Sequence, residues 1–267
     1  LDNHEFTKFS PQMIFGNIYQ KDKQKALDLA YKSAFLMGEQ LKEICIDVNF
    51  SPVCDLLFDN AHKVIGDRSF GSDPELVLNL SNSFCKALKD SGIIPVPKHF
   101  PGHGRSKFDT HLRSSIINES YNDLVKTDLV PFKILDKSLM VMLAHIKYPL
   151  IDSKVATYSN EIIRNILRKK FKFKGLVISD DISMKAIKED LQTKVTNCYE
   201  GGCDIVMYCK GDLNDIKLIY PYVQILKNKV MNFFYNEKKK IILKRKNNNK
   251  FKSDLIEYNL INNAPKS

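Results

Sequence analysis

The sequence predicts an α/β fold in which helices alternate with the strands of a parallel sheet. Strand-length apolar runs recur along the chain, segments with a helical apolar stripe separate them, and no run reaches the roughly 18 apolar residues of a membrane span. Buried strands of a parallel sheet read as continuous apolar runs because both faces are covered. The segments that read this way are residues 44–50, 93–97, 139–145, 175–179 and 203–208.

Helical segments are expected between these strands. From Lys23 to Lys42 the apolar residues recur on one helical face. Asp73 and Pro74 predict a helix start, as cap and first helical residue, and Gly92 predicts its end. The other expected helices run from about Glu161 to Lys170 and from about Met184.

The predicted organisation is one α/β domain over residues 1–235, followed by a basic helix or tail over residues 236–267 with an asparagine run at 247–249. The first residues have neither the basic start nor the apolar core of a signal peptide. The six cysteines form no Cys-x-x-Cys pair, so we interpret them as reduced thiols. We therefore expect a cytoplasmic protein with no membrane span.

The formal charge of +10 raises the question of a nucleic-acid partner. Much of the excess lies in Lys/Arg-rich stretches such as residues 168–170 and 237–246, in a chain also rich in Asn and Ile. No recognised nucleic-acid-binding motif accompanies the charge. We interpret it as solvated helix faces and expect no nucleic-acid partner.

Residues 98–111 read Lys-His-Phe-Pro-Gly-His-Gly-Arg-Ser-Lys-Phe-Asp-Thr-His and directly follow the strand at 93–97. In an extended loop, residues two apart point the same way, so the carboxylate of Asp109 can reach the imidazole of His111. Such a carboxylate fixes the tautomer of the ring and raises the basicity of its other nitrogen. The structural alternative is that His111 is an ordinary surface histidine.

A metal site is the other hypothesis for this stretch, because it contains His99, His103 and His111. Pro101 and Gly102 prevent the regular helix that would align the first two imidazoles. The stretch is also no phosphate loop, since the Gly-Lys-Ser/Thr ending is missing. We expect neither a metal nor a cofactor.

A second polar motif, Ser179-Asp180-Asp181-Ile182-Ser183-Met184, ends the strand at 175–179. A carboxylate in this place can either carry chemistry or cap the next helix. With two adjacent aspartates, one can do each.

Together these motifs resemble the family 3 β-N-acetylglucosaminidases, which trim peptidoglycan fragments. Residues 98–104 with Asp109-Thr110-His111 are similar to their catalytic loop, and residues 177–184 to their nucleophile motif. Val-Ile-Gly-Asp-Arg-Ser-Phe-Gly at 64–71 resembles a substrate loop of the same family. The resemblance covers about residues 10–210 and implies a TIM (β/α)8 barrel, likewise α/β, that is incomplete here: about five of its eight strands are present.

The resemblance also implies roles. Asp180 maps to the nucleophile, His111 to the acid/base, and Asp109 to the residue that orients it. Asp55 matches a family position, and we interpret it as structural. The residues expected to contact the substrate are Arg68, Lys98, His99 and His145, the last as pocket wall.

The implied reaction is retaining hydrolysis of terminal non-reducing β-linked N-acetylglucosamine from muropeptides, so the expected partner is a small amino sugar. The oligomeric state is not predicted. The family's Asp-x-Glu-Gly-Gly-Arg-Val-x-Arg segment is missing. The alternative is a truncated, catalytically inactive remnant or a fragment of such an enzyme, or a carbohydrate-binding relic. A β-glucosidase is disfavoured, since those enzymes take the acid/base glutamate from elsewhere. For Lys98 and Arg68 the alternative is a surface cation.

Overall fold

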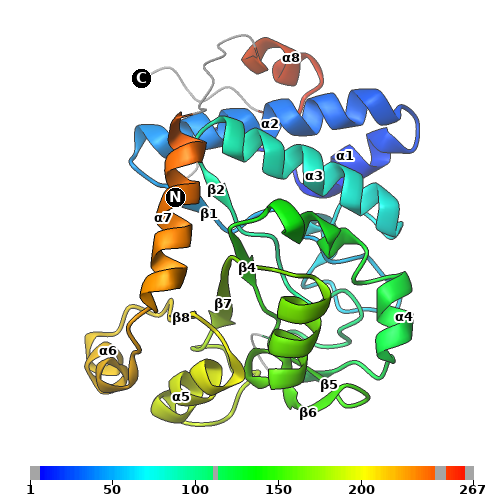
Figure 1. Ribbon diagram of the computed structural model, residues 1–267. Coiled ribbons are helices and arrows are strands. Elements are labelled where there is room, and N and C mark those ends of the chain that lie inside the picture. The colour runs from blue at the N-terminus through cyan, green and yellow to red at the C-terminus, as the bar shows by residue number, and fades with distance from the viewer. Residues whose placement is uncertain (1–6, 111–113, 244–250, 262–267) are drawn as a thin grey trace.

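The computed structural model describes residues 7–110, 114–243 and 251–261 (Figure 1). Its central feature is a set of parallel strands. β1 pairs with β2, and β7 lies between β4 and β8, all in parallel. Backbone hydrogen bonds from Phe100 N to Met142 O (2.8 Å) and from Ala144 N to Phe100 O (2.8 Å) join the two sheets. The strands are β1 (Val48–Asn49), β2 (Ile94–Pro95), β4 (Met140–Met142), β7 (Leu176–Asp181) and β8 (Ile205–Met207).

Each of the five predicted strand segments therefore contains or overlaps one strand of this sheet, and the predicted parallel α/β fold is confirmed. A closed barrel of this type has eight strands. The described part of the chain holds a spatial run of five, in the order β1-β2-β4-β7-β8, with helices between them, as expected of an incomplete (β/α)8 barrel.

Three helices near the N-terminus and one near the C-terminus lie together at one end of the sheet (Figure 1). α2 and α3 pack side by side, and their buried faces share a core that includes Phe15, Phe35, Leu80 and Leu88. α8 rests on α2 from the other side. The helices of this layer are α1 (Gln12–Tyr19), α2 (Lys23–Glu43), α3 (Pro74–Asp90) and α8 (Phe251–Glu257).

A second core lies under β4 and β7 and includes Phe132, Val141, Ile166 and Val177. The π-helix η4 (Glu161–Lys170) has the bounds that the sequence predicts for a helix. The remaining helices are η1 (Gly66–Arg68), α4 (Tyr121–Lys126), η2 (Pro131–Lys137), η3 (Ala156–Tyr158), α5 (Leu191–Gly201), α6 (Leu213–Ile219) and η5 (Tyr220–Tyr222). In a small separate sheet, β3 (Ser115–Ile116) pairs in parallel with β5 (Ile146–Tyr148), and β5 pairs antiparallel with β6 (Asp152–Val155).

The predicted start of α3 is confirmed: the Asp73 carboxylate accepts a hydrogen bond from Leu76 N at 2.6 Å, and Pro74 is the first helical residue. The predicted helix from Met184 is wrong, because α5 begins only at Leu191. Side-chain caps explain the difference. Asp181 accepts from Ser183 N at 2.9 Å and holds a turn, whereas Asp190 accepts from Thr193 N at 2.8 Å and starts the helix.

α7 (Asn228–Leu243) packs against the sheet beside β1 and β2 (Figure 1). Its apolar side chains, Val230, Phe233, Phe234 and Ile241, meet a cluster of sheet residues that includes Met140 and Ile178. Lys238 Nζ also lies 2.7 Å from Asp47 Oδ2. The helix spans the position between residues 235 and 236 where the sequence places the start of the C-terminal segment. The asparagine run at 247–249 lies outside the described residues.

All six cysteines lie in the described part, and none forms a disulfide there; four of them are buried, as small apolar residues. None of the described helices combines the length and the hydropathy that crossing a bilayer requires.

Candidate active site

The site residues predicted at strand ends come together because β2, β4 and β7 are parallel and end at the same edge of the sheet. Lys98 and His99 follow β2, His145 follows β4, and Asp180 lies near the end of β7. Their mutual effects on pKa show the proximity: burial and the charge of Arg68 lower the pKa of Lys98, and the charges of Asp180 and Asp55 oppose this shift.

Asp180 has only 9% of its surface exposed, and its carboxylate accepts a hydrogen bond from Asp181 N at 2.9 Å. Burial by itself would raise the pKa of this carboxyl. The charges of His99 and His145, with the backbone hydrogen bond, outweigh burial and hold the pKa below its ordinary value. Asp180 is therefore ionised near neutral pH, which is the state in which a carboxylate acts as a nucleophile.

Asp181 has a different task. Its carboxylate accepts hydrogen bonds from Ser183 N at 2.9 Å, from Ser183 Oγ at 2.5 Å and from Cys209 N at 3.0 Å. These contacts shape the turn after β7 and tie it to the segment after β8. Of the two adjacent aspartates, Asp181 holds the loop and Asp180 does not.

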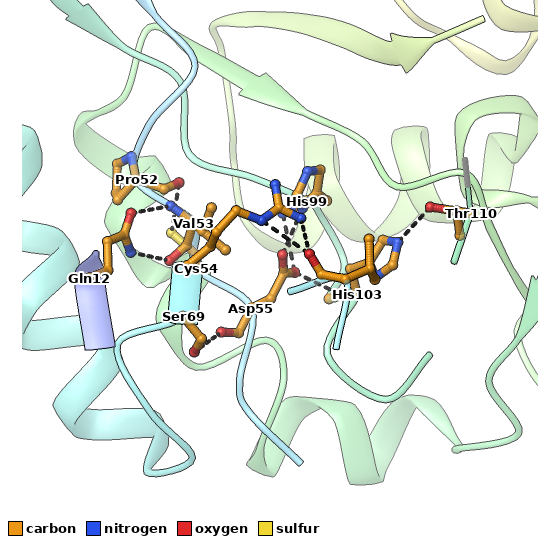
Figure 2. A network of polar contacts seen from close by, with 12 residues as sticks. Gln12, Pro52, Val53, Cys54, Asp55, Ser69, His99, His103 and Thr110 are labelled. Carbon is orange, nitrogen blue, oxygen red and sulfur yellow. Dashed lines mark hydrogen bonds and ion pairs between the residues drawn. The ribbon is translucent and has the colours of Figure 1, made fainter. Parts of the chain in front are cut away.

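Asp55 is the centre of a polar network, which Figure 2 shows. One carboxylate oxygen lies 2.6 Å from His99 Nδ1, and the other accepts from His99 N at 3.2 Å and from His103 N at 2.7 Å. Asp55 is buried, which would raise its pKa, but the charge and hydrogen bonds of His99 and His103 hold the pKa below the ordinary value. An ionised carboxylate only accepts, so the proton of this contact is on His99 Nδ1.

The segment that carries Asp55 is itself fastened on both sides (Figure 2). Gln12 of α1 exchanges two hydrogen bonds of 3.0 Å with the backbone of Val53, and Ser69 Oγ donates to Asp55 O at 2.7 Å. The sequence predicts a structural role for Asp55, and its contacts with His99 place it at the candidate site as well. Val53 forms a parallel bridge with Lys98, so the residues that follow the two segments emerge side by side.

The substrate-contact candidates Arg68 and Lys98 are not free surface cations. Arg68 donates to Val64 O from Nε at 3.1 Å and from Nη2 at 2.6 Å, which fixes the guanidinium. Lys98 is half-buried. The ammonium group of Lys98 and the guanidinium group of Arg68 lie close enough to affect each other, and together they provide donors for several acceptors of a polar ligand.

His145 is buried and has both ring nitrogens occupied. Nε2 lies 3.2 Å from Asp181 O, which only accepts, so Nε2 carries the proton; Nδ1 then accepts from the Thr157 hydroxyl at 3.0 Å. Burial lowers the pKa of His145, against the attraction of Asp180. These contacts suit a neutral residue near Asp180, and the role of His145 as pocket wall stays a prediction.

The loop after Lys98 is anchored along its length. A Cβ on Gly104 would lie 1.8 Å from Leu56 O, so only glycine fits there. Arg105 donates to Asp128 Oδ2 at 2.8 Å and to Glu119 Oε1 at 3.1 Å.

His103 fastens the far end of the same loop, with Nε2 lying 2.9 Å from Thr110 Oγ1 (Figure 2). Burial, with the charge of His99, lowers the pKa of His103 to about 4, so the ring is neutral at neutral pH.

Thr110 is buried and stands directly after Asp109, which is half-buried. His111 lies outside the described residues, so the contact between Asp109 and His111 stays a prediction. No three His, Cys, Asp or Glu side chains of the described ranges are arranged to hold a metal ion. His99 Nδ1 and His103 Nε2 already have protein partners.

Comparisons with known proteins show which family the chain resembles. Residues 3–242 match the model of the glycosyl hydrolase family 3 N terminal domain. A beta-hexosaminidase of Hydrogenovibrio crunogenus is 37% identical over 198 residues, which are 73% of this chain and 55% of that protein. The chain thus spans about half the length of this curated relative.

Solved structures are similar too. Native NagZ from Neisseria gonorrhoeae superposes with a TM-score of 0.79 and 32% identity, over 86% of this chain and 67% of NagZ. The same protein in complex with N-trifluoroacetyl-D-glucosamine gives a TM-score of 0.80 and 29% identity, over 94% of this chain and 72% of NagZ. From the matched family domain and these relatives, we conclude that the chain belongs to glycosyl hydrolase family 3.

Proposed function

We propose that this protein removes terminal non-reducing β-linked N-acetylglucosamine from muropeptides in the cytoplasm, with retention of configuration. The observation that supports this most is Asp180: a nearly buried carboxylate with a pKa held low, near His99, His145 and Lys98. An ionised carboxylate in such a setting matches the nucleophile of a retaining glycosidase. The N-acetylglucosamine analogue bound by the similar NagZ supports an amino sugar as the substrate.

In the proposed first step, Asp180 attacks the anomeric carbon while the glycosidic C–O bond breaks. His111 gives its proton to the leaving oxygen, and a covalent glycosyl ester with Asp180 forms. In the second step His111 takes a proton from water, the water oxygen attacks the anomeric carbon, and the Asp180 carboxylate leaves. Asp109 orients His111 in both steps.

The other residues of the site have binding roles in this proposal. Lys98 and Arg68 donate to acceptor oxygens of the sugar. His99, with its Nδ1 proton held by Asp55, presents Nε2 as an acceptor for a sugar hydroxyl when the ring is neutral. Hydrogen bonds to sugar hydroxyls that strengthen in the transition state contribute several kcal/mol in glycosidases.

The test is hydrolysis of 4-nitrophenyl N-acetyl-β-D-glucosaminide by the purified chain, by Asp180→Ala, and by the control Asp136→Asn, an exposed aspartate of η2. Asp180→Ala should lose at least about a thousandfold in kcat, and Asp136→Asn should not change. Sodium azide should restore turnover of the Asp180→Ala variant and yield an α-linked glycosyl azide. Wild-type turnover that survives Asp180→Ala contradicts the proposed nucleophile.

An inactive remnant is the second candidate, and the observation that favours it is the partial coverage of the relatives. This function predicts no turnover from well-folded protein. Binding of N-acetylglucosamine, followed by NMR titration of the same sample, then separates a sugar-binding relic from a chain with no ligand.

A further inference from the structure

The buried side chain of Lys194 is not used by the chemistry described above. Lys194 belongs to α5, and only 7% of its surface is exposed. A lysine is almost never buried this deeply unless its charge is paired or hydrogen-bonded. Here its Nζ donates to two backbone oxygens, Ile182 O at 2.8 Å and Met184 O at 3.4 Å.

Both oxygens belong to the turn at residues 181–184, which begins one residue after Asp180. Met184 N donates to Asp181 O at 3.1 Å and closes the turn. Ile182 and Met184 are buried, and buried backbone oxygens need donors. A helix would supply the N–H groups of later residues, but α5 begins further along the chain. The Nζ group therefore takes the place of these donors.

The peptide group of Asp181 joins this turn to the Asp180 carboxylate. Asp181 N donates to Asp180 Oδ1 at 2.9 Å, and Asp181 O lies 3.2 Å from His145 Nε2. Burial lowers the pKa of His145, and the charge of Lys194 lowers it too, which places the amine near this contact. A displaced turn would therefore shift the hydrogen bond that orients the Asp180 carboxylate.

We propose that Lys194 is a positioning residue: by fixing the turn after β7, it holds the Asp180 carboxylate in the orientation for attack. The proposal rests on the proposed function, in which Asp180 is the nucleophile. An attacking atom has to lie about 3–3.5 Å from the atom that it attacks, with the orbitals aligned, so a small shift of the carboxylate slows the reaction strongly. Lys194 itself touches no reacting atom and acts only through the backbone of the turn.

The test compares three variants of the full chain. Lys194→Met has a side chain of similar length and no donor, whereas Lys194→Arg keeps donors. Val195→Ala is the control. Val195 is the next residue of α5 and is 1% exposed, so its truncation loosens the packing of the helix but keeps the amine. Urea unfolding gives the folded fraction, and kcat is calculated per folded protein.

Turnover of 4-nitrophenyl and 4-methoxyphenyl N-acetyl-β-D-glucosaminides is the first measurement. Lys194→Met should lose about 100-fold in kcat on both substrates, with KM unchanged within about twofold, because a misplaced nucleophile slows attack whatever the leaving group. Lys194→Arg should recover most of this loss, and Val195→Ala should match wild type. Equal losses per folded protein in Lys194→Met and Val195→Ala overturn the positioning role.

The second measurement does not need turnover. Because the Asp181 N–H donates to Asp180, its ¹H–¹⁵N NMR signal reports on that contact. The signal should move in Lys194→Met and stay in place in Val195→Ala, and an unmoved signal in Lys194→Met also overturns the proposal. If Lys194→Met does not fold, Lys194→Gln, whose shorter side chain has one amide group, is judged by the same two measurements. Failure of the proposed function has another signature: wild type then hydrolyses neither substrate, while the Asp181 signal still distinguishes Lys194→Met from Val195→Ala.

Discussion

Replacement of Asp55 by asparagine should reverse the hydrogen-bonding role of His99. The two side chains have the same shape, so the packing of the buried site is kept. The amide oxygen can replace Oδ1, which accepts from His99 N at 3.2 Å and from His103 N at 2.7 Å. The NH2 group then faces His99 Nδ1 across the 2.6 Å contact and donates to it. The ring proton must move to Nε2, so the atom that faced the ligand as an acceptor becomes a donor.

The size of the effect follows from burial and charge. Asp55 is 1% exposed, and hydrogen bonds to charged groups contribute about 1.5–3 kcal/mol each. Asp55→Asn keeps the contacts with the two backbone N–H groups and loses the charge in the contact with His99 Nδ1. We therefore expect the free energy of unfolding to fall by about 2 kcal/mol at pH 7. A sugar hydroxyl that loses its acceptor should bind about 10- to 100-fold more weakly.

Two measurements check this expectation. Urea unfolding gives the change in stability, with Asp136→Asn as an exposed aspartate control. The ¹⁵N chemical shifts of the His99 ring report which nitrogen carries the proton in wild type and in Asp55→Asn. A ring that keeps its proton on Nδ1 in the variant, or a stability change below about 0.5 kcal/mol, would refute the reasoning.

Three further changes test the loop that carries the predicted acid/base. Gly104→Ala places a Cβ 1.8 Å from Leu56 O and should lower the free energy of unfolding by about 3 kcal/mol. Urea unfolding measures this change, and a urea midpoint equal to that of wild type would show that the backbone relaxes around the new methyl group. His103 has a folded pKa of about 4 against about 6.5 when unfolded, so the unfolded state binds the proton first and stability falls as the pH drops from about 6.5 to 4. His103→Gln should remove that part of the pH slope, and a slope that remains would exclude His103 as its source. His111→Gln should slow hydrolysis of 4-methoxyphenyl glycosides far more than of 4-nitrophenyl ones, because only the poorer leaving group needs the proton; equal losses would argue against acid catalysis.

The strands of this fold were predictable because a parallel strand is buried on both faces and shows it in composition. The segment 139–145 contains β4, whose residues are all buried, and 175–179 overlaps β7, of which only Asp181 is not buried. Helix starts were less predictable where two capping residues compete. Asp181 and Asp190 both accept hydrogen bonds from backbone N–H groups two and three residues on, and local sequence does not show which of them starts a helix.

The residues of the candidate site also differ in how well the sequence predicts them. The resemblance to the family names Lys98, His99 and Asp180. These residues and His145 stand at or after the end of a predicted strand, and parallel strands bring their ends together. Asp55 stands 44 residues from its partner His99, and no spacing in the sequence links the two, so the sequence does not predict this contact. Long-range pairs of this kind depend on the register of neighbouring strands, here the bridge between Val53 and Lys98.

The register of β7 decides which of the adjacent residues Asp180 and Asp181 faces the candidate site. Successive side chains on a strand point to opposite faces, so adjacent aspartates at the end of β7 cannot share a task. One carboxylate is held among His99, His145 and Lys98, and the other closes the turn through Ser183 and Cys209. A shift of β7 by a single residue would exchange them. The backbone bonds of β7 to β4 and β8 therefore determine which carboxylate is available for chemistry, and they do so from inside the sheet, away from any ligand.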